Sequence, residues 1–206
     1  LGTDGQGLLR RTGDLFQTYT TEDGLSSNLI MSIAKKSNGD FIMGTYDAGI
    51  SIFQLKGAKV YDHNDELPST TVWTVQEIEG TVVAGTSKGL FAEKEGEIKI
   101  VSYEDGLPGN RVTSLLTTKN RELIAGTDSG LAWINSGFKV EKTVKALHGA
   151  LLTGVRSIHA GSDGIFCGTN AGLLKVDSKG NAVLSQLPNE AQIYAMAIDS
   201  LENIWV

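Results

Sequence analysis

The dipeptide Gly-Thr recurs along this chain at nearly constant intervals. Its glycines stand at positions 2, 44, 85, 126 and 168, so the steps are 42, 41, 41 and 42 residues. A second glycine followed by Leu or Ile comes four or five residues later each time, at Gly7, Gly49, Gly89, Gly130 and Gly172. A repeat of this length is typical of a four-stranded propeller blade or of a helix pair in a solenoid. The repeat therefore limits the chain to two architectures.

The residues within one period form short strand-like runs. Between positions 112 and 144 these runs are VTSLLTT, RELIAGT, GLAWIN and FKVEKTV, separated by the turn residues KN, DS and SG. Helix pairs would need apolar residues spaced three and four apart over ten or more residues, and no stretch sustains that spacing. We therefore expect an all-β fold, a β-propeller of four-stranded antiparallel blades with a period of about 41 residues and roughly five blades' worth of chain.

The first two strands of each period have distinct compositions. The second is apolar without alternation, as in FIM at 41 and LIA at 123, which predicts a strand covered on both faces by neighbouring blades. The first carries a small residue at one equivalent position: Ser32, Thr74, Ser114, Ser157 and Ala195. We expect the repeated glycines to allow close approach and positive φ, and the threonines to bond a nearby backbone group. These residues are predicted to be architectural.

A single propeller over residues 1–206 is expected, with blades at 26–65, 68–105, 108–147 and 151–186 and a partial blade at each end. Leu1 immediately precedes one Gly-Thr, and the sequence Asn-Ile-Trp-Val ends where the next is due. The two partial blades could close a five-bladed ring. We expect instead an excerpt of a longer propeller.

Charge and composition exclude some function classes. The 206 residues contain 18 Lys and Arg against 24 Asp and Glu, a net charge of −6, so the basic excess typical of nucleic-acid binding is absent. No apolar run approaches the roughly 18 residues that a membrane span needs. We expect no nucleic-acid partner and no membrane contact by this domain itself. The one cysteine, Cys167, lies in the apolar run GIFCGT and is predicted to be an inert core thiol.

Several segments carry a family resemblance. The unit DGLSSNLIMSIAKKSNGDFIMGTYDAGISIF, with DELPSTTVWTV, DGLPGNRVTSLL and NIWV elsewhere, resembles the two-component regulator propeller repeat. That family's pattern is Asp-Gly-Leu-Pro-Ser-Asn, a short strand, a turn, then aromatic-apolar-Gly-Thr and Gly-Leu. The period around ALHGALLTGVRSIH lacks the Asp-Gly-Leu-Pro segment, and among the second strands only Trp205 retains the family's tryptophan. These departures indicate a diverged array.

The resemblance implies a ligand-binding sensor domain of a two-component signalling protein, in the periplasmic or extracytoplasmic part of a membrane-anchored bacterial protein. It implies a small-molecule or oligosaccharide ligand and leaves open a homodimer through the full-length sensor. It implies no cofactor, and no enzyme activity in this region, although a kinase output domain can lie outside the chain. A protein–protein interaction propeller and a propeller lyase or glycosidase are the alternatives.

Two sets of connections are expected at one face of the propeller: the turn after each second strand and the segment entering the next blade. Loops on a rigid scaffold are where binding residues concentrate. The candidate ligand-binding residues are Tyr46, Asp47, Trp73, Lys88, Arg111, Asp128, Arg156, Asn170 and Tyr194. The competing interpretation is that the polar members only form turns and that Trp73 is a core residue between blades.

Catalytic and metal sites are not predicted. The histidines His63, His148 and His159 fall after an outer strand, in an inter-blade loop and at the far end of an inner strand. They should not converge for nucleophilic or metal chemistry. The segment GSDGIFCGT only partly matches a sialidase-like Asp box, because the serine directly abuts Asp163 and no tryptophan follows.

Overall fold

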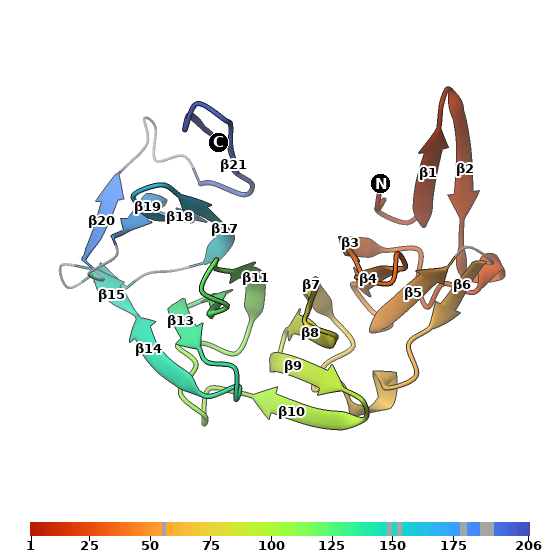
Figure 1. The fold of residues 1–206 in the computed structure, drawn as a ribbon, viewed down its shortest axis with the longest axis horizontal. Helices are drawn as coiled ribbons and strands as arrows, with labels where there is room; N and C mark the ends of the chain where they lie inside the picture. The colour runs from red at the N-terminus through yellow and green to blue at the C-terminus, as the bar shows by residue number, and fades with distance from the viewer. Residues whose placement is uncertain (55–56, 148–149, 152–153, 178–180, 186–191) are drawn as a thin grey trace. The chain divides into compact units, whose positions relative to one another are not determined.

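The chain is described by a computed structural model that covers residues 1–54, 57–147, 150–151, 154–177, 181–185 and 192–206 (Figure 1). It divides into two compact units, Leu1–Ile100 and Val101–Val206, each of which is described by itself. Regular structure in the described residues is β, apart from two 3-10 helices, η1 (Thr21–Asp23) and η2 (Asn64–Glu66). The predicted all-β class is confirmed.

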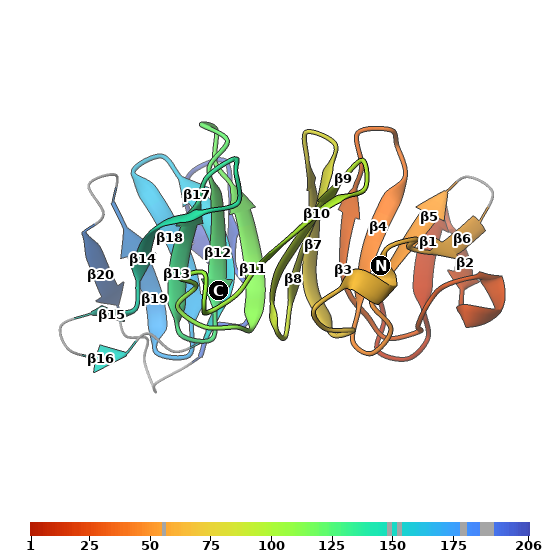
Figure 2. The same cartoon turned by 90° about the horizontal axis from the view of Figure 1, so that it is seen from below.

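The first unit contains one hairpin and two four-stranded antiparallel sheets, with strand orders β3-β4-β5-β6 and β10-β9-β8-β7. The first strands of the two sheets, β3 and β7, lie side by side (Figure 2). The strands are β1 (Leu8–Thr12), β2 (Leu15–Tyr19), β3 (Ile30–Lys35), β4 (Phe41–Thr45), β5 (Ile50–Gln54), β6 (Gly57–Val60), β7 (Val72–Ile78), β8 (Thr81–Thr86), β9 (Gly89–Lys94) and β10 (Glu97–Val101).

The second unit repeats this pattern, with sheets ordered β11-β12-β13-β14 and β17-β18-β19-β20 and two short hairpins. The strands are β11 (Val112–Thr117), β12 (Leu123–Thr127), β13 (Gly130–Ile134), β14 (Val140–Val144), β15 (Ala146–Leu147), β16 (Ala150–Leu151), β17 (Val155–Gly161), β18 (Gly164–Thr169), β19 (Gly172–Val176), β20 (Ala182–Ser185), β21 (Ala197–Ile198) and β22 (Ile204–Trp205). The predicted four-stranded antiparallel sheets are thus present, whereas the period, the blade number and the blade boundaries stay predictions.

Gly44 and Gly126, the glycines of two Gly-Thr pairs, lie where two sheets approach closely. Gly126 pairs with Ser114 of the adjacent strand. A Cβ on Gly126 would lie 2.3 Å from Ser114 Oγ and 2.6 Å from Val155 Cγ1 of the next sheet. Neither distance is compatible with a side chain there, so the packing of first strand against second strand requires glycine.

The threonine that follows holds the turn after the second strand. Thr45, Thr86, Thr127 and Thr169 are fully buried. Each hydroxyl donates to the carbonyl of the second glycine of its repeat, at 2.8, 2.8, 3.0 and 2.8 Å respectively. Each also accepts a backbone N–H from within the turn, at 3.1 Å. The second glycines have positive φ, for example +135° at Gly130. The architectural roles predicted for these residues are confirmed.

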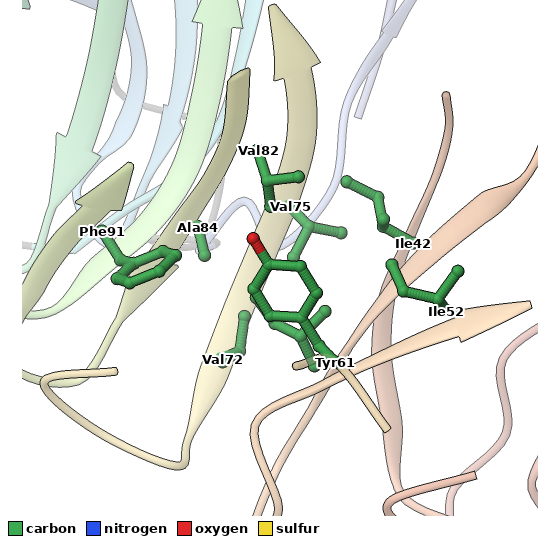
Figure 3. Packing of buried hydrophobic residues seen from close by; sticks show 9 residues of the cluster. Ile42, Ile52, Tyr61, Val72, Val75, Val82, Ala84 and Phe91 are labelled. Carbon is green, nitrogen blue, oxygen red and sulfur yellow. The ribbon is translucent and has the colours of Figure 1, made fainter. Parts of the chain in front are cut away.

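The core of the first unit fills the space between its two four-stranded sheets. Figure 3 shows Ile42 and Ile52 from the first sheet facing Val75, Val82 and other residues of the second, with the Tyr61 ring between them. The second strands β4, β8 and β12 are buried on both sides along most of their length, as predicted from their unbroken apolar runs. In the second unit Cys167 belongs to the corresponding core and is fully buried, and this burial raises the pKa of its thiol to about 12. It is an inert core residue, as expected.

Candidate functional site

The turns after the second strands lie beside the segments that enter the next sheet. Main-chain hydrogen bonds join the two: Gly49 N donates to Thr70 O at 2.8 Å in the first unit, and Gly154 N to Asp128 O at 2.9 Å in the second. The two sets of connections therefore meet at one end of the sheets, as the sequence predicted. We call it the Gly-Thr end, meaning in each unit the end at which the Gly-Thr turns lie.

A β-bulge interrupts the first strand of every four-stranded sheet at the Gly-Thr end. The pairing slips between Ile30 and Ser32, Val72 and Thr74, Val112 and Ser114, and Val155 and Ser157. One residue in each strand is therefore unpaired, and bulges of this kind redirect a side chain. The four bulge residues are Met31, Trp73, Thr113 and Arg156.

In the first unit an aromatic pair forms at the Gly-Thr end. Tyr46, from the turn between β4 and β5, is 50% exposed and packs edge-on against Trp73, with ring centroids 5.9 Å apart and an interplanar angle of 82°. The indole Nε1 of Trp73 donates to Ser87 Oγ at 2.9 Å, which fixes the ring. Trp73 is half-buried, so the ligand-binding and the packing interpretations of this residue both stay predictions.

A pocket of about 470 Å³ lies next to this pair and is lined by Thr3, Asp4, Leu29, Ile30, Met31 and Tyr46. Its walls come from three segments that are held together by the main chain, with Ile30 N donating to Thr3 O at 3.1 Å and Tyr46 N to Leu29 O at 3.0 Å. Apolar walls with a few polar groups are typical of small-ligand sites. Of the lining residues the sequence had singled out Tyr46 alone. The exposed Met31, at a position equivalent to Trp73, is the signal that could have pointed to the others.

Two further candidates of the first unit, Asp47 and Lys88, are exposed at the same end. Asp47 follows Tyr46 in the turn after β4. Lys88 lies in the turn after β8, where its backbone N–H donates to Thr86 Oγ1 at 3.1 Å. Both side chains are accessible to a ligand, and both residues also belong to tight turns, so their predicted binding role stays a prediction.

In the second unit three candidates come together. Arg156, in the bulge of β17, donates from Nε to Asn170 Oδ1 at 2.8 Å. Its guanidinium carbon lies 4.8 Å from the centroid of the Tyr194 ring. Tyr194 is 65% exposed, and its hydroxyl donates to Gln192 Oε1 at 3.1 Å. The cluster of arginine, amide and aromatic ring is solvent-accessible at the Gly-Thr end.

Asp128 and Arg111 are joined through the backbone. Asp128 N donates to Arg111 O at 3.0 Å, and the Arg111 side chain is exposed. The Oδ1 atom of Asp128 is buried without a hydrogen-bond partner in the described part of the chain, and a Cβ at Gly109 would lie 2.0 Å from it. The carboxylate thus faces the chain at Gly109, which favours the turn-forming interpretation of Asp128 over ligand contact.

Histidine and acidic side chains meet in the first unit, away from the aromatic pair. His63 Nε2 lies 3.9 Å from Glu93 Oε1 and His63 Nδ1 3.6 Å from Glu66 Oε1. The buried Tyr61 hydroxyl donates to Glu93 Oε2, and Gly96 N donates to Glu93 Oε1 at 2.7 Å. Burial, followed by this hydrogen bond, raises the pKa of Tyr61 above its ordinary range. Burial alone would raise the pKa of Glu93, but the bonds from Tyr61 and Gly96 outweigh it and hold that pKa below its ordinary value.

Of the other two histidines, only His159 lies in the described residues. His159 is half-buried on β17 in the second unit, and His148 lies outside the described residues. Within the described ranges, no group of three or more His, Cys, Asp and Glu side chains is arranged to hold a metal ion. No helix in those ranges is long and apolar enough to cross a membrane.

No protein-family model matches this sequence, and no functionally curated protein is significantly similar to it. Solved structures are similar. The extracellular domain of a hybrid two-component system from B. thetaiotaomicron superposes with a TM-score of 0.83 at 20% identity, covering 99% of this chain and 30% of that one. A second such domain from the same organism gives 0.83 at 20% identity, covering 97% and 28%. Virginiamycin B lyase from Staphylococcus aureus gives 0.69 at 15% identity, covering 85% and 62%.

These likenesses show the fold. The chain has the blade fold of β-propellers, and the resemblance expected from its repeats is confirmed at the level of the fold. It spans less than a third of the two extracellular domains that it superposes on.

Proposed function

We propose that this chain is a ligand-binding part of an extracytoplasmic sensor in a two-component signalling protein, and that its ligand is a small molecule, with an oligosaccharide as the leading class. The observation that carries the proposal is the Tyr46–Trp73 pair beside a pocket of about 470 Å³. Flat aromatic faces cover the apolar faces of sugar rings, while polar groups at the rim bond the hydroxyls. Thr3 and Asp4 supply polar groups at this rim.

The extracellular two-component domains of the same fold support the sensor role and a periplasmic location. The proposal includes a single propeller over 1–206 that is an excerpt of a longer one, and leaves a homodimer of the full-length sensor open. It assigns no catalytic activity to this region. A protein-interaction propeller is the alternative that the experiment below separates from it.

The test is a thermal-shift screen of the protein against neutral and acidic oligosaccharides. A ligand at 100 times its Kd adds about 2.7 kcal/mol of stability, which is a measurable shift in Tm. We expect one oligosaccharide class to stabilise the protein, and Trp73→Leu to abolish that shift. Phe16→Leu is the matched control, because Phe16 is 59% exposed on β2, outside the Gly-Thr turns.

If no saccharide shifts the Tm, the proposed ligand class is wrong, and the protein-interaction alternative is favoured. A shift that survives Trp73→Leu would place the ligand elsewhere.

A further inference from the structure

Arg156 is held in one orientation by two side chains of the second unit. Its Nε bonds Asn170 Oδ1 at 2.8 Å, and its guanidinium lies over the Tyr194 ring at 4.8 Å. A guanidinium has five N–H groups in a planar fork, and Nε carries only one of them. No described residue accepts a hydrogen bond from the two terminal nitrogens.

The partner that fixes Arg156 is itself fixed by the backbone. Gly154 packs directly against the Asn170 amide, since a Cβ on Gly154 would lie 2.3 Å from Asn170 Nδ2. Gly154 has a φ of +61° and donates its N–H to Asp128 O at 2.9 Å. A guanidinium held on such a support loses little further side-chain entropy when a ligand binds, which is how preorganised sites gain affinity.

Within the described residues, no acidic side chain forms an ion pair with Arg156. Asn170 is a neutral acceptor and Tyr194 a neutral ring. The chain carries a net charge of −6, and Arg156 is nevertheless exposed, held in one orientation and without an ion pair to the described acidic side chains. The two terminal nitrogens of a guanidinium fit a planar oxyanion, because two of its oxygens can each accept a hydrogen bond.

We propose that Arg156, supported by Asn170 and Tyr194, is a subsite of the second unit for a carboxylate group, and that the saccharide bound by this unit is therefore acidic. This inference rests on the proposed function and adds the charge of the ligand to it. The Tyr194 ring, 65% exposed, offers its surface to the sugar that carries the carboxylate.

The test is isothermal titration of the whole chain with three probes: a galacturonate trisaccharide, the neutral galactose trisaccharide and N-acetylglycine. We expect the galacturonate to bind best, and Arg156→Met to weaken it about 10- to 150-fold, the range for loss of a charged hydrogen bond. Arg156→Lys should restore only part of the affinity, because an ammonium has no planar fork. Arg10→Met, an exposed arginine of β1, removes the same charge and should leave binding unchanged.

The outcomes separate the two proposals. If both trisaccharides bind equally and Arg156→Met changes neither, the carboxylate subsite is overturned while the saccharide sensor stands. If only N-acetylglycine binds, and Arg156→Met abolishes its binding, the carboxylate subsite is confirmed and the proposed saccharide class of the ligand is wrong. Binding of none of the three probes would overturn the acidic-saccharide inference and count against the sensor proposal.

Discussion

Replacing Thr127 by valine tests whether the recurring threonine is a structural residue. Valine has nearly the same shape, so no cavity forms. The change removes a hydroxyl that donates to Gly130 O at 3.0 Å and accepts from Ser129 N at 3.1 Å. Thr127 is fully buried, so water cannot replace these bonds. At about 0.5 to 1.5 kcal/mol net for each hydrogen bond, the expected loss is about 1 to 3 kcal/mol.

The assay is urea unfolding followed by circular dichroism, in which the midpoint should fall while the slope stays constant. Thr18→Val is the control: Thr18 is exposed on β2, and its change should stay within about 0.5 kcal/mol. Thr45→Val, at the equivalent position of the first unit, should behave like the Thr127 variant. If Thr127→Val cost no more than Thr18→Val, the hydroxyl would not be what holds the turn, and the reasoning on the whole repeat would fail.

Gly126→Ala should destabilise the fold by about 1 to 3 kcal/mol, because the new methyl group would overlap Ser114 Oγ and Val155 Cγ1; an unchanged Tm would show that the sheets are not in tight contact there. Tyr61→Phe should cost about 1.5 to 3 kcal/mol at pH 7, since it removes the donor to the ionised Glu93. The pKa of Glu93 is lower in the folded protein, so its ionised form stabilises the fold above the unfolded pKa of about 4.3, and this contribution is lost as pH falls through the folded pKa. Urea unfolding should therefore show a smaller difference between wild type and Tyr61→Phe at pH 3 than at pH 7, and an equal difference would contradict the assignment.

The strands were predictable because the apolar runs and the turn residues that separate them favour the same local structure. The four runs expected between 112 and 144 correspond to β11–β14, and their turns contain the Gly, Asn, Asp and Ser residues that turns require. The 3-10 helix η1 was not foreseen. It is held by a reciprocal capping bond between Thr20 and Asp23, a signature so short that it is also common in plain turns. Whether the repeats close into a ring depends on packing between blades, which local pattern does not encode.

The candidate site was predictable only in part. Trp73 and Tyr194 were selected because aromatic faces suit a sugar, and Arg156 because a charged residue near an apolar inner strand needs a partner. Met31 and the pocket beside it were missed, since an apolar residue in an apolar strand attracts no notice. The bulges could not be foreseen either, because an extra residue in one strand appears only when the pairing with the neighbouring strand is known.

Within the first strand of a sheet, the residues on either side of the bulge have a structural role, whereas the role of the bulge residue varies from sheet to sheet. Val112 and Val155, on the near side of the slip, are fully buried, and the serines on the far side pair with the glycines of the repeat. The residue between them belongs to neither pattern. Thr113 is short, and its hydroxyl donates to Val155 O of the next sheet, so there the position strengthens the packing. Arg156 in the same position is too long for that bond and extends to the exposed Gly-Thr end.

We therefore predict that the side chain at this position decides whether a sheet contributes a structural bond or a ligand contact, while the strand pairing on either side stays the same. Exchanging these side chains should alter ligand preference with little change in the fold. Arg156→Thr is the direct case: we expect stability within about 0.5 kcal/mol of the wild type, as for other exposed positions, and loss of the preference for the acidic trisaccharide. Unfolding of this variant would show instead that the arginine and its contacts to Asn170 and Tyr194 hold the sheet end together.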